Sequence, residues 1–415
     1  MRRSSLLALT GAVLLGLAVP AQAQQPAQIQ LPDGEGKSVV QNRCSACHGL
    51  NMINNMTGST KEQWHALFST MVKLPGDQAD TVASYLATSF PTQMKPPAVL
   101  VPGPATVAIK EWIVPTLGQR PHDPLATPDG AIWWTGQYID VLGRLDPRTG
   151  AMKEYPLKAG AGPHGLVVDK AGNIWYTGNG KANNVGKLDP KTGEVTEYAL
   201  PDPKSRGPHT PIFDQKGNFW FTLQSGQVGR VVPSTGEVKI ATTPTANTYP
   251  YGIQVNSQGV PWYVDFRGNR LGSVNPVTME ITEYTLPNPD SRPRRLALTP
   301  DDVVWYADYS RGYLGRYDPK TSQTREWASP GGSKSQPYGI AAVGNVIWYS
   351  ESGVKPNTLV RFDTQTEKFQ TWVIPSGGGV VRNMMATKDG NLVLACSAVN
   401  RVALVEVGKG IGKTQ

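Results

Sequence analysis

The sequence predicts an all-β fold, a seven-bladed β-propeller, preceded by a small all-α domain. Three observations lead to this prediction. A segment of about 42–45 residues recurs seven times in the long carboxyl-terminal part of the chain. Three stretches with helical periodicity precede the repeats and surround a Cys-x-x-Cys-His motif. The 415-residue chain also contains 44 Gly and 35 Pro, which indicates many turns.

The amino end has the pattern of a secretory signal. A basic start at Arg2 and Arg3 leads into a short apolar run, which ends in the small-residue segment Ala21-Gln22-Ala23. We expect a signal peptide over residues 1–23 and export to a bacterial periplasm. An uncleaved anchor is the alternative. The apolar run is short for a membrane span and no other stretch approaches one, so no stable span is expected after processing.

The formal net charge of +8 favours acidic or anionic partners. Lys and Arg number 40 against 32 Asp and Glu, but they form no run of the kind that binds nucleic acid. We therefore expect no nucleic-acid partner. A mildly basic surface instead suits a small anionic substrate or the acidic face of another protein.

Two of the 3 Cys, Cys44 and Cys47, lie three apart in "NRCSACHGLN", and His48 follows directly. A zinc knuckle would need two more ligands nearby, and a thioredoxin-like site would need a βαβ context. In an exported chain the motif is typical of c-type haem attachment, in which two thiols add to the haem vinyl groups and the imidazole ligates the iron. We expect one covalent haem c here. Cys396 is expected to be a buried, small apolar residue.

The segments around this motif predict a small group of helices. "DGEGKSVVQNRCSACHG" can form a helix that runs into the motif. "STKEQWHALFSTMVKL" has Ser59 and Glu62 in capping-box spacing, and "GDQADTVASYLATSF" has Asp77 as its expected cap. A motif-bearing helix, a middle helix and a closing helix resemble a small class I cytochrome c domain. The resemblance covers about residues 30–95, and we expect the haem domain over residues 24–95. The resemblance implies a haem-binding fold that transfers single electrons.

The resemblance also implies a second axial ligand, commonly a methionine sulfur. Met71 lies just before the loop into the closing helix, where the axial Met of that family would fall, and we expect it to ligate the haem iron opposite His48. An open sixth position would instead allow oxygen or peroxide chemistry. Four other residues compete with Met71 for this role: Met52, Met56, His65 and Met94.

Residues 96–105 are Pro-rich and predict a stiff linker to a repeat region over residues 106–410. Each repeat continues through a turn segment such as "VGKLDPKTG" into an alternating strand such as "EVTEYAL". Four short antiparallel strands at this period make one propeller blade. The first half of the repeat recurs as "RPHDPLATPDGAIWWTG", "GPHGLVVDKAGNIWYTG", "GPHTPIFDQKGNFWFTL", "YPYGIQVNSQGVPWYVD", "RPRRLALTPDDVVWYAD", "QPYGIAAVGNVIWYSE" and the degenerate "VVRNMMATKDGNLVLAC".

The two ends of the repeat region predict how the ring closes. The last copy stops after its third strand, "RVALVEV" at residues 401–407, and the missing outer strand is found in "VAIKEWIVP" at residues 107–115. Pairing them removes exposed sheet edges, whereas a sandwich pair or an open solenoid is the alternative. One tryptophan per repeat is expected to pack between blades: Trp133, Trp175, Trp220, Trp262, Trp305 and Trp348.

The segment "PHGLVVDKAGNIWYTG…NVGKLDPKTGEVTEYALP" resembles the virginiamycin B lyase (streptogramin lyase) group of seven-bladed propellers, and the likeness covers about residues 105–407. The resemblance implies elimination that opens a lactone ester, with a His as base beside a divalent metal held by glutamates. One Glu of that pattern stands two residues before the His, and another ends the next strand of the same blade. A blade signature supports the fold more than the chemistry, so the residues are compared one by one.

The glutamates of this pattern are missing from the blades that carry the candidate bases His122, His164 and His209. The residues two before them are Arg120, Gly162 and Gly207, and those fourteen after them are Gly136, Gly178 and Leu223. The acids at the strand-end position belong to blades in which Tyr or Arg replaces the His. This separation of base from metal ligands argues against streptogramin lyase activity.

Three of the 5 His nevertheless occupy one repeat position in consecutive blades, at the mouth of the central channel. We expect the imidazoles of His122, His164 and His209 to share a divalent metal, or one of them to act as a base. Alternatively, each ring bonds a backbone carbonyl as part of the repeat. The later blades are expected to form a polar rim for an anionic substrate or a redox partner, or else a solvated, salt-bridged surface: Tyr251, Asp265, Arg294, Asp308, Tyr338, Glu351 and Arg382.

Three classes of function fit these observations. The first, which we favour, is an exported c-type haem protein that transfers single electrons with a periplasmic donor or acceptor, while the propeller binds a substrate or partner. The second is a carbon–oxygen lyase of the streptogramin lyase type with an accessory cytochrome domain. The third is a non-catalytic propeller that binds a ligand while the haem senses redox state.

Overall fold

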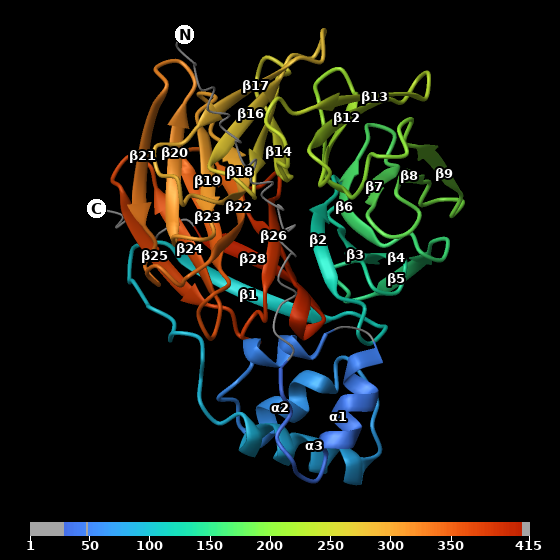
Figure 1. The fold of residues 1–415 in the computed structure, drawn as a ribbon, viewed down its shortest axis with the longest axis vertical. Coiled ribbons are helices and arrows are strands. Elements are labelled where there is room, and N and C mark those ends of the chain that lie inside the picture. Colours follow the sequence, from blue (N-terminus) through green and yellow to red (C-terminus); the bar gives the residue numbers. More distant parts are fainter. Residues whose placement is uncertain (1–28, 47–48, 409–415) are drawn as a thin grey trace, which may run out of the picture.

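The computed structural model describes residues 29–46 and 49–408, which form a helical domain and a propeller (Figure 1). The expected signal peptide at residues 1–23 and the haem-motif residues Cys47 and His48 lie outside the described residues. Within the described part of the chain, no helix has the length and apolar character needed to cross a membrane.

The helical domain, residues 29–90, is built from short helices. They are α1 (Lys37–Arg43), the 3-10 segments Cys44–Ala46 and Leu50–Asn55, α2 (Lys61–Phe68) and α3 (Gly76–Ser89). Apolar residues at helical spacing give α2 and α3 one buried face each. The buried side chains include Trp64, Leu67 and Phe68 of α2 and Val82, Tyr85 and Leu86 of α3.

The start of α2 differs by one residue from the sequence prediction. The capping box is formed by Thr60, whose hydroxyl accepts the Gln63 N–H, and by Gln63, whose side chain accepts the Thr60 N–H. Ser59 instead donates to the carbonyl of Met56 at 2.6 Å, so its hydroxyl is already used in the preceding turn. Asp77 lies in the first turn of α3 rather than at its cap.

The propeller consists of seven four-stranded antiparallel sheets, which confirms the predicted blade number. The blades surround a common central axis, and their first strands lie nearest to it (Figure 1). Blades 1 to 3 are β2 (Pro121–Ala126), β3 (Ile132–Gly136), β4 (Val141–Leu145) and β5 (Met152–Pro156); β6 (Pro163–Val168), β7 (Ile174–Gly178), β8 (Asn184–Leu188) and β9 (Val195–Ala199); and β10 (Pro208–Phe213), β11 (Phe219–Leu223), β12 (Gln227–Val232) and β13 (Glu237–Thr242).

Blades 4 to 6 repeat this arrangement. They are β14 (Pro250–Val255), β15 (Pro261–Asp265), β16 (Arg270–Val274) and β17 (Ile281–Thr285); β18 (Pro293–Leu298), β19 (Val304–Asp308), β20 (Tyr313–Asp318) and β21 (Gln323–Ala328); and β22 (Pro337–Val343), β23 (Val346–Glu351), β24 (Thr358–Asp363) and β25 (Lys368–Val373).

Blade 7 closes the ring with strands from both ends of the propeller. It contains β26 (Val381–Ala386), β27 (Leu392–Cys396) and β28 (Arg401–Gly408), and its outer strand is β1 (Thr106–Ile113). The register between β1 and β28 runs from Thr106 opposite Gly408 to Ile113 opposite Arg401. The predicted closure by the amino-terminal strand is therefore confirmed.

The recurring tryptophans pack between blades, as predicted; the ring centroid of Trp175 in blade 2, for example, lies 5.3 Å from that of Phe219 in blade 3. All six are buried, and five stack on an aromatic ring of the outer strand of their own blade. In blade 1, for example, the ring centroids of Trp133 and Tyr155 lie 5.2 Å apart, and in blade 2 those of Trp175 and Tyr198 lie 5.1 Å apart. These stacks fill the space across each sheet and give the blades a common geometry.

The helical domain sits on the face of the propeller at which the inner strands begin, here called the top face. This face is formed by the loops that precede each inner strand and by the loops between the second and third strands of each blade. Lys355 from one such loop donates to the carbonyls of Met56 and Thr57 and to the Ser59 hydroxyl, at 3.1, 2.9 and 2.7 Å. The Gly118 N–H donates to the carbonyl of Thr70.

The linker after the helical domain is attached to blade 6. The amide N–H of Thr371 in β25 donates to the carbonyl of Val101, and the Thr371 side chain binds the backbone of Val99 and Val101. Figure 1 shows this linker rising along the outside of the propeller from the helical domain. These contacts hold the helical domain over the top face on the side of blades 6, 7 and 1.

Candidate functional site

A bulge near the start of each inner strand directs two consecutive side chains towards the channel. In blade 1 the register shifts between Pro121 and Pro124, so His122 and Asp123 lie outside the regular pairing with β3. The register also shifts at the start of the inner strand in the other six blades. In blades 5 and 7 the shift leaves out only Arg294 and Arg382, and the residue after each is paired with the second strand. A bulge interrupts the alternation of side chains between the two faces of a strand, so two consecutive side chains can point to the same side.

The first residue of each bulge contributes to a ring at the top of the channel, here called the upper ring. The imidazole centroids of His122 and His164 lie 3.7 Å apart, and those of His164 and His209 also lie 3.7 Å apart. The ring continues with the aromatic contact between His209 and Tyr251 at 3.8 Å. The hydroxyls of Tyr251 and Tyr338 are 2.5 Å apart. By repeat position the upper ring comprises His122, His164, His209, Tyr251, Arg294, Tyr338 and Arg382.

The residue that follows each upper-ring residue contributes to a lower layer, which joins opposite blades. Asp123 accepts from the Arg295 guanidinium at 2.8 Å and from the Asn383 amide at 2.9 Å. Burial raises the pKa of Asp123, and the charge of Arg295 opposes this shift. Glycines alternate with these large residues. A Cβ on Gly252 would come within 2.8 Å of the Arg295 Cα, so the lower layer has no room there for a side chain.

Hydroxyl residues in the second strands fix the bulges. The Thr135 hydroxyl accepts the Asp123 N–H at 3.1 Å and donates to the carbonyl of His164 at 2.8 Å. The same bridge recurs with Thr177 and Thr222, and each links the bulge of its own blade to the upper-ring residue of the next. Ser350 bridges in the same way to Val381, the residue before Arg382. The positions of His164, His209 and Tyr251 are therefore set by two blades each.

The three histidines are neutral at physiological pH. The pKa of each ring lies well below its ordinary value, first because burial disfavours the charged form and then because cationic or imidazole groups lie nearby. His122 donates from Nδ1 to Asp123 at 2.9 Å, which leaves its Nε2 as an acceptor. Nδ1 of His164 and Nε2 of His209 are buried and have no hydrogen-bond partner among the described residues.

One group in the described part of the chain has the donor set for a metal ion. Ligand atoms of His122, Asp123 and His164 lie within 4.8 Å of one another. Two imidazoles and a carboxylate suit a transition-metal ion such as Zn²⁺. However, both oxygens of Asp123 already bind neighbouring groups, and Arg295 adds a positive charge at the same place. The donor set therefore fits a cation chemically but not electrostatically.

Arginine and tyrosine side chains dominate the opposite side of the upper ring. The Arg294 guanidinium carbon lies 3.8 Å from the ring centroid of Tyr338, and Arg294 donates to the Tyr251 hydroxyl at 3.3 Å. Burial would raise the pKa of Tyr338, but Arg294, Arg382 and Arg295 outweigh it and lower the pKa to about 8. Tyr338 is thus the most acidic phenol of the site.

The structure does not bring the three candidate rim carboxylates into the upper ring. Asp265 accepts the N–H groups of Tyr249 and Arg267, and Asp308 accepts that of Arg292 and pairs with Arg311 at 3.1 Å. Glu351 accepts from Ser329, Gly331 and Thr358 within blade 6. All three carboxylates are buried and hold loops of their own blades. Tyr251, Arg294, Tyr338 and Arg382 of the candidate rim do belong to the upper ring.

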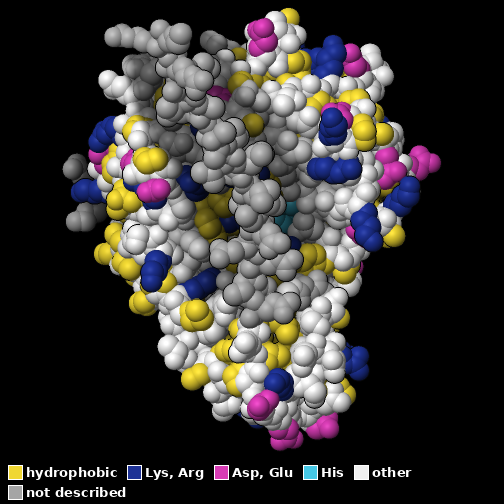
Figure 2. All heavy atoms as spheres, in the orientation of Figure 1, with side chains coloured by type: hydrophobic (Ala, Val, Ile, Leu, Met, Phe, Trp, Pro, Cys, Tyr) yellow, Lys and Arg dark blue, Asp and Glu magenta, His cyan; other side chains and the backbone are white. Residues whose placement is uncertain are grey.

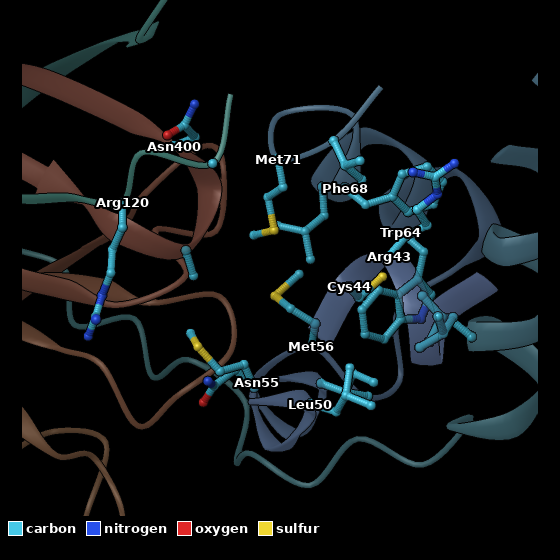
Figure 3. Close-up of a pocket in the computed structure, with 18 of the residues that line it drawn as sticks. Arg43, Cys44, Leu50, Asn55, Met56, Trp64, Phe68, Met71, Arg120 and Asn400 are labelled. Carbon is cyan, nitrogen blue, oxygen red and sulfur yellow. The ribbon is translucent and has the colours of Figure 1, made fainter. Parts of the chain in front are cut away.

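A second candidate site lies between the helical domain and the propeller. This interdomain pocket is lined mainly by apolar side chains, including Val40, Trp64, Leu67 and Phe68. Cys44, Met56 and Met71 direct their sulfur atoms into the same space (Figure 3). Arg120, Tyr138 and Asn400 close it from the propeller. Figure 2 shows hydrophobic side chains gathered on the adjoining face of the helical domain.

Only some of the candidates for the second axial haem ligand line the pocket. Met52, Met56 and Met71 line it, whereas His65 and Met94 are exposed and do not. Cys396 is fully buried in β27, as expected, and burial raises the pKa of its thiol well above the ordinary value.

Several residues of the channel were not identified from the sequence. Asp123 and Asn383 stand one position after the repeated Pro-His or its equivalent and were not singled out, whereas Arg295 was expected at the polar mouth together with Arg294 and Arg382. Arg120 is the first residue of the first repeat segment; it lines the interdomain pocket and donates to the Tyr138 hydroxyl at 2.6 Å. The available signal was the alternation of large residues with glycine at the position after the histidines.

Comparisons with known proteins bear on the propeller. The model of the virginiamycin B lyase family matches residues 104–342. A streptogramin B lyase structure is 25% identical with a TM-score of 0.66, and the alignment covers 73% of this chain and 98% of that one. A catalytically inactive virginiamycin B lyase from Staphylococcus aureus with quinupristin is 23% identical with a TM-score of 0.65, covering 72% and 99%. No curated protein matched the sequence.

A more distant likeness concerns the fold alone. The extracellular domain of a hybrid two-component system from B. thetaiotaomicron is 16% identical with a TM-score of 0.55, and the alignment covers 72% of this chain and 42% of that one. The family match begins at residue 104, after the helical domain, and extends into blade 6 over more than half of the chain. The resemblance of the blade segments is therefore confirmed, and the chain belongs to the virginiamycin B lyase family.

Proposed function

We propose that this protein is an exported haem c protein that transfers single electrons, with the propeller channel binding a ligand next to the haem. The observation that carries the proposal is the interdomain pocket. The pocket has an apolar lining, and the sulfur atoms of Cys44, Met56 and Met71 face it (Figure 3). Cys47 and His48 follow Cys44 closely in the sequence. These features suit a covalently bound haem.

The residues of the pocket fit this group in chemistry as well as in position. A porphyrin is apolar except for its propionates, so the buried faces of α2 and α3 suit its ring. Arg43 lines the same pocket and can neutralise a propionate. Cys44 and Cys47 would provide the thioether links, His48 one axial ligand, and Met71 the other. Met56 is the alternative to Met71, since both sulfur atoms face the pocket.

When bound, the haem would supply reversible one-electron chemistry, and the surrounding chain would set its conditions. Trp64, Leu67 and Phe68 exclude water from one side of the pocket, and a thioether ligand favours the reduced state. Arg120 lines the pocket from the propeller and precedes the inner strand that carries His122. The channel and the pocket are thus connected through one short segment of chain.

Lyase chemistry in the channel is the second candidate, and family membership favours it. His164 is a neutral, buried imidazole with an unpartnered nitrogen, which suits a general base. His122, Asp123 and His164 could hold a divalent metal. Against this reading, the glutamates of the lyase pattern are replaced by Arg120, Gly162 and other residues, and Asp123 is paired with Arg295. A propeller that only binds its ligand is the remaining alternative.

One preparation can distinguish these functions. The full chain is expressed in a bacterial host competent in c-type haem maturation, and its export is checked in the periplasmic fraction. The proposal predicts a coloured protein whose reduced and oxidised spectra are those of a six-coordinate c-type haem. Stoichiometric divalent metal, lost when His122 and His164 are replaced by Ala, together with opening of quinupristin, would establish the lyase instead. A colourless, metal-free protein would leave ligand binding alone.

A further inference from the structure

We propose that Arg120, Arg294 and Arg382 form a binding site for a small oxyanion at the top of the channel. The ligand class is a carboxylate or a phosphate, whose oxygen atoms match the fork of a guanidinium. This inference deepens the proposed function by naming the class of channel ligand, but its test does not require the haem.

The three guanidinium groups lack acidic partners. Among the ion pairs of the described residues, none includes Arg120, Arg294 or Arg382, whereas the neighbouring Arg295 is paired with Asp123. In each of the three, the buried Nε has no hydrogen-bond partner in the described structure. Buried donors on a cation are costly to leave unused, so a bound anion would satisfy them.

The cations are also close enough to act on one another. Burial, followed by the charge of Arg382, lowers the pKa of Arg120 to about 10. Burial, then Lys355 and Arg382, lowers the pKa of Lys95 to about 8. Arg382 therefore lies near two other cations, Arg120 and Lys95. An anion placed among them would replace repulsion by attraction, whereas a metal cation would add to the repulsion.

The backbone of Arg120 supports a role for its side chain. Its φ is 55°, in the left-handed region, and the corresponding residues of blades 2 and 3 are Gly162 and Gly207, with φ of 52° and 66°. Glycine adopts this conformation without steric cost, whereas arginine does not. In blade 6 the corresponding residue is Gln336, with φ of 51°, so this repeat position requires a left-handed residue, and blade 1 places a cationic side chain there.

Arg294 is held in place before any ligand arrives. Its guanidinium carbon lies 3.8, 4.3, 4.5 and 5.1 Å from the ring centroids of Tyr338, Tyr309, Phe266 and Tyr251. These rings hold the side chain without neutralising its charge. A cation already ordered in this way loses little conformational freedom when it binds an anion.

The site can be tested by calorimetric titration of the full chain with sodium succinate and, separately, with inorganic phosphate. The titrations use Tris chloride buffer at low ionic strength and pH 7. We expect one bound anion per chain for at least one probe. Arg382→Gln and Arg120→Gly should each weaken this binding at least tenfold. Arg267→Gln, which removes an exposed arginine near Tyr249, should change it less than twofold.

Each outcome bears on the inference. Tighter binding of succinate would assign a carboxylate, and tighter binding of phosphate would assign a phosphate-bearing ligand. No heat from either probe, or equal losses in Arg382→Gln and Arg267→Gln, would overturn the site, provided circular dichroism shows that the variants are folded. A colourless protein that binds the anion would refute the haem proposal alone. A haem protein that binds neither probe would refute the anion site alone.

Discussion

Asp123 and Arg295 face each other across the propeller channel, with 2.8 Å between Oδ1 and Nη2 and only 3% of either side chain exposed. This pair connects blade 1 with blade 5, so it joins parts of the ring that share no sheet. Asn383 adds a third blade through its bond to Asp123. The lower layer therefore stabilises the ring from its centre, beneath the residues that we expect to contact a ligand.

Removing one partner of this buried pair should destabilise the propeller. Asp123→Asn leaves the Arg295 charge buried without a counter-ion, and we expect the free energy of unfolding to fall by about 3 kcal/mol. Guanidinium chloride denaturation measures this change. The exposed pair Arg325–Glu367 provides the control, since Glu367→Gln should cost less than about 1 kcal/mol. Equal effects of the two substitutions would contradict the structural role of the Asp123–Arg295 pair.

Lys355 should anchor the helical domain to the propeller. Its ammonium group donates to three acceptors of the segment Met56–Ser59, so Lys355→Met leaves partly buried acceptors without their partner. We expect a loss of about 2 kcal/mol in the attachment of the helical domain. Hydrogen exchange should rise in residues 50–60 while the blades stay protected. Lys320→Met, on an exposed turn, should have no such effect. Unchanged exchange in Lys355→Met would refute the anchor.

Binding of an anion in the channel should weaken as the pH rises through about 8. Tyr338 has a pKa of about 8, and its ionisation places a negative charge beside the anion site. Above this pH the phenolate competes with the ligand for the arginines, and below it the phenol does not. The groups that face Tyr338 are Arg120, Arg294, Arg295, Arg382, Tyr251 and Tyr309. Calorimetry between pH 7 and 9 measures the trend.

The variant Tyr338→Phe isolates this effect. It keeps the aromatic ring beneath Arg294 but removes the ionisable hydroxyl, so the affinity for the anion should become nearly independent of pH between 7 and 9. If the affinity of the variant falls with pH as steeply as that of the unchanged protein, another group is responsible and the assignment to Tyr338 is wrong.

Met71 should determine the redox potential of the bound haem. Replacing an axial thioether removes the ligand that favours the reduced iron, so Met71→Ala should lower the midpoint potential by on the order of 0.1 V, within the wide range that axial ligands span. Met56→Ala provides a matched control, because it removes a second sulfur atom from the same pocket. Loss of the sulfur–iron absorption band in Met56→Ala alone would assign the ligand to Met56 instead.

The repeat was enough to predict the blades because each carries the same local signals. Trp133 and its equivalents, the turn residues and the truncated last copy together determined the number of blades and the pairing of β1 with β28. The start of α2 was placed one residue too early, since Ser59 and Thr60 are both plausible caps. Only the structure shows that the Ser59 hydroxyl donates to the carbonyl of Met56.

The contents of the channel were only partly predictable. His122, His164 and His209 shared a repeat position, so their convergence followed from the symmetry of the ring. The bulge that adds Asp123 depends on the hydroxyl bridge of Thr135, which links two blades and leaves no local pattern. Glu351 was expected to face the ligand, yet it binds loop groups within blade 6, because three donors converge on it there.

The most direct test of the central claim is the mass of the tryptic peptide spanning residues 44–61, isolated from the exported protein. This peptide contains both cysteines of the motif and His48. If the helical domain binds haem c, the peptide carries the added mass of one haem, and a variant with Cys44→Ser and Cys47→Ser carries none. An unmodified peptide from a host that matures other c-type cytochromes would contradict the account.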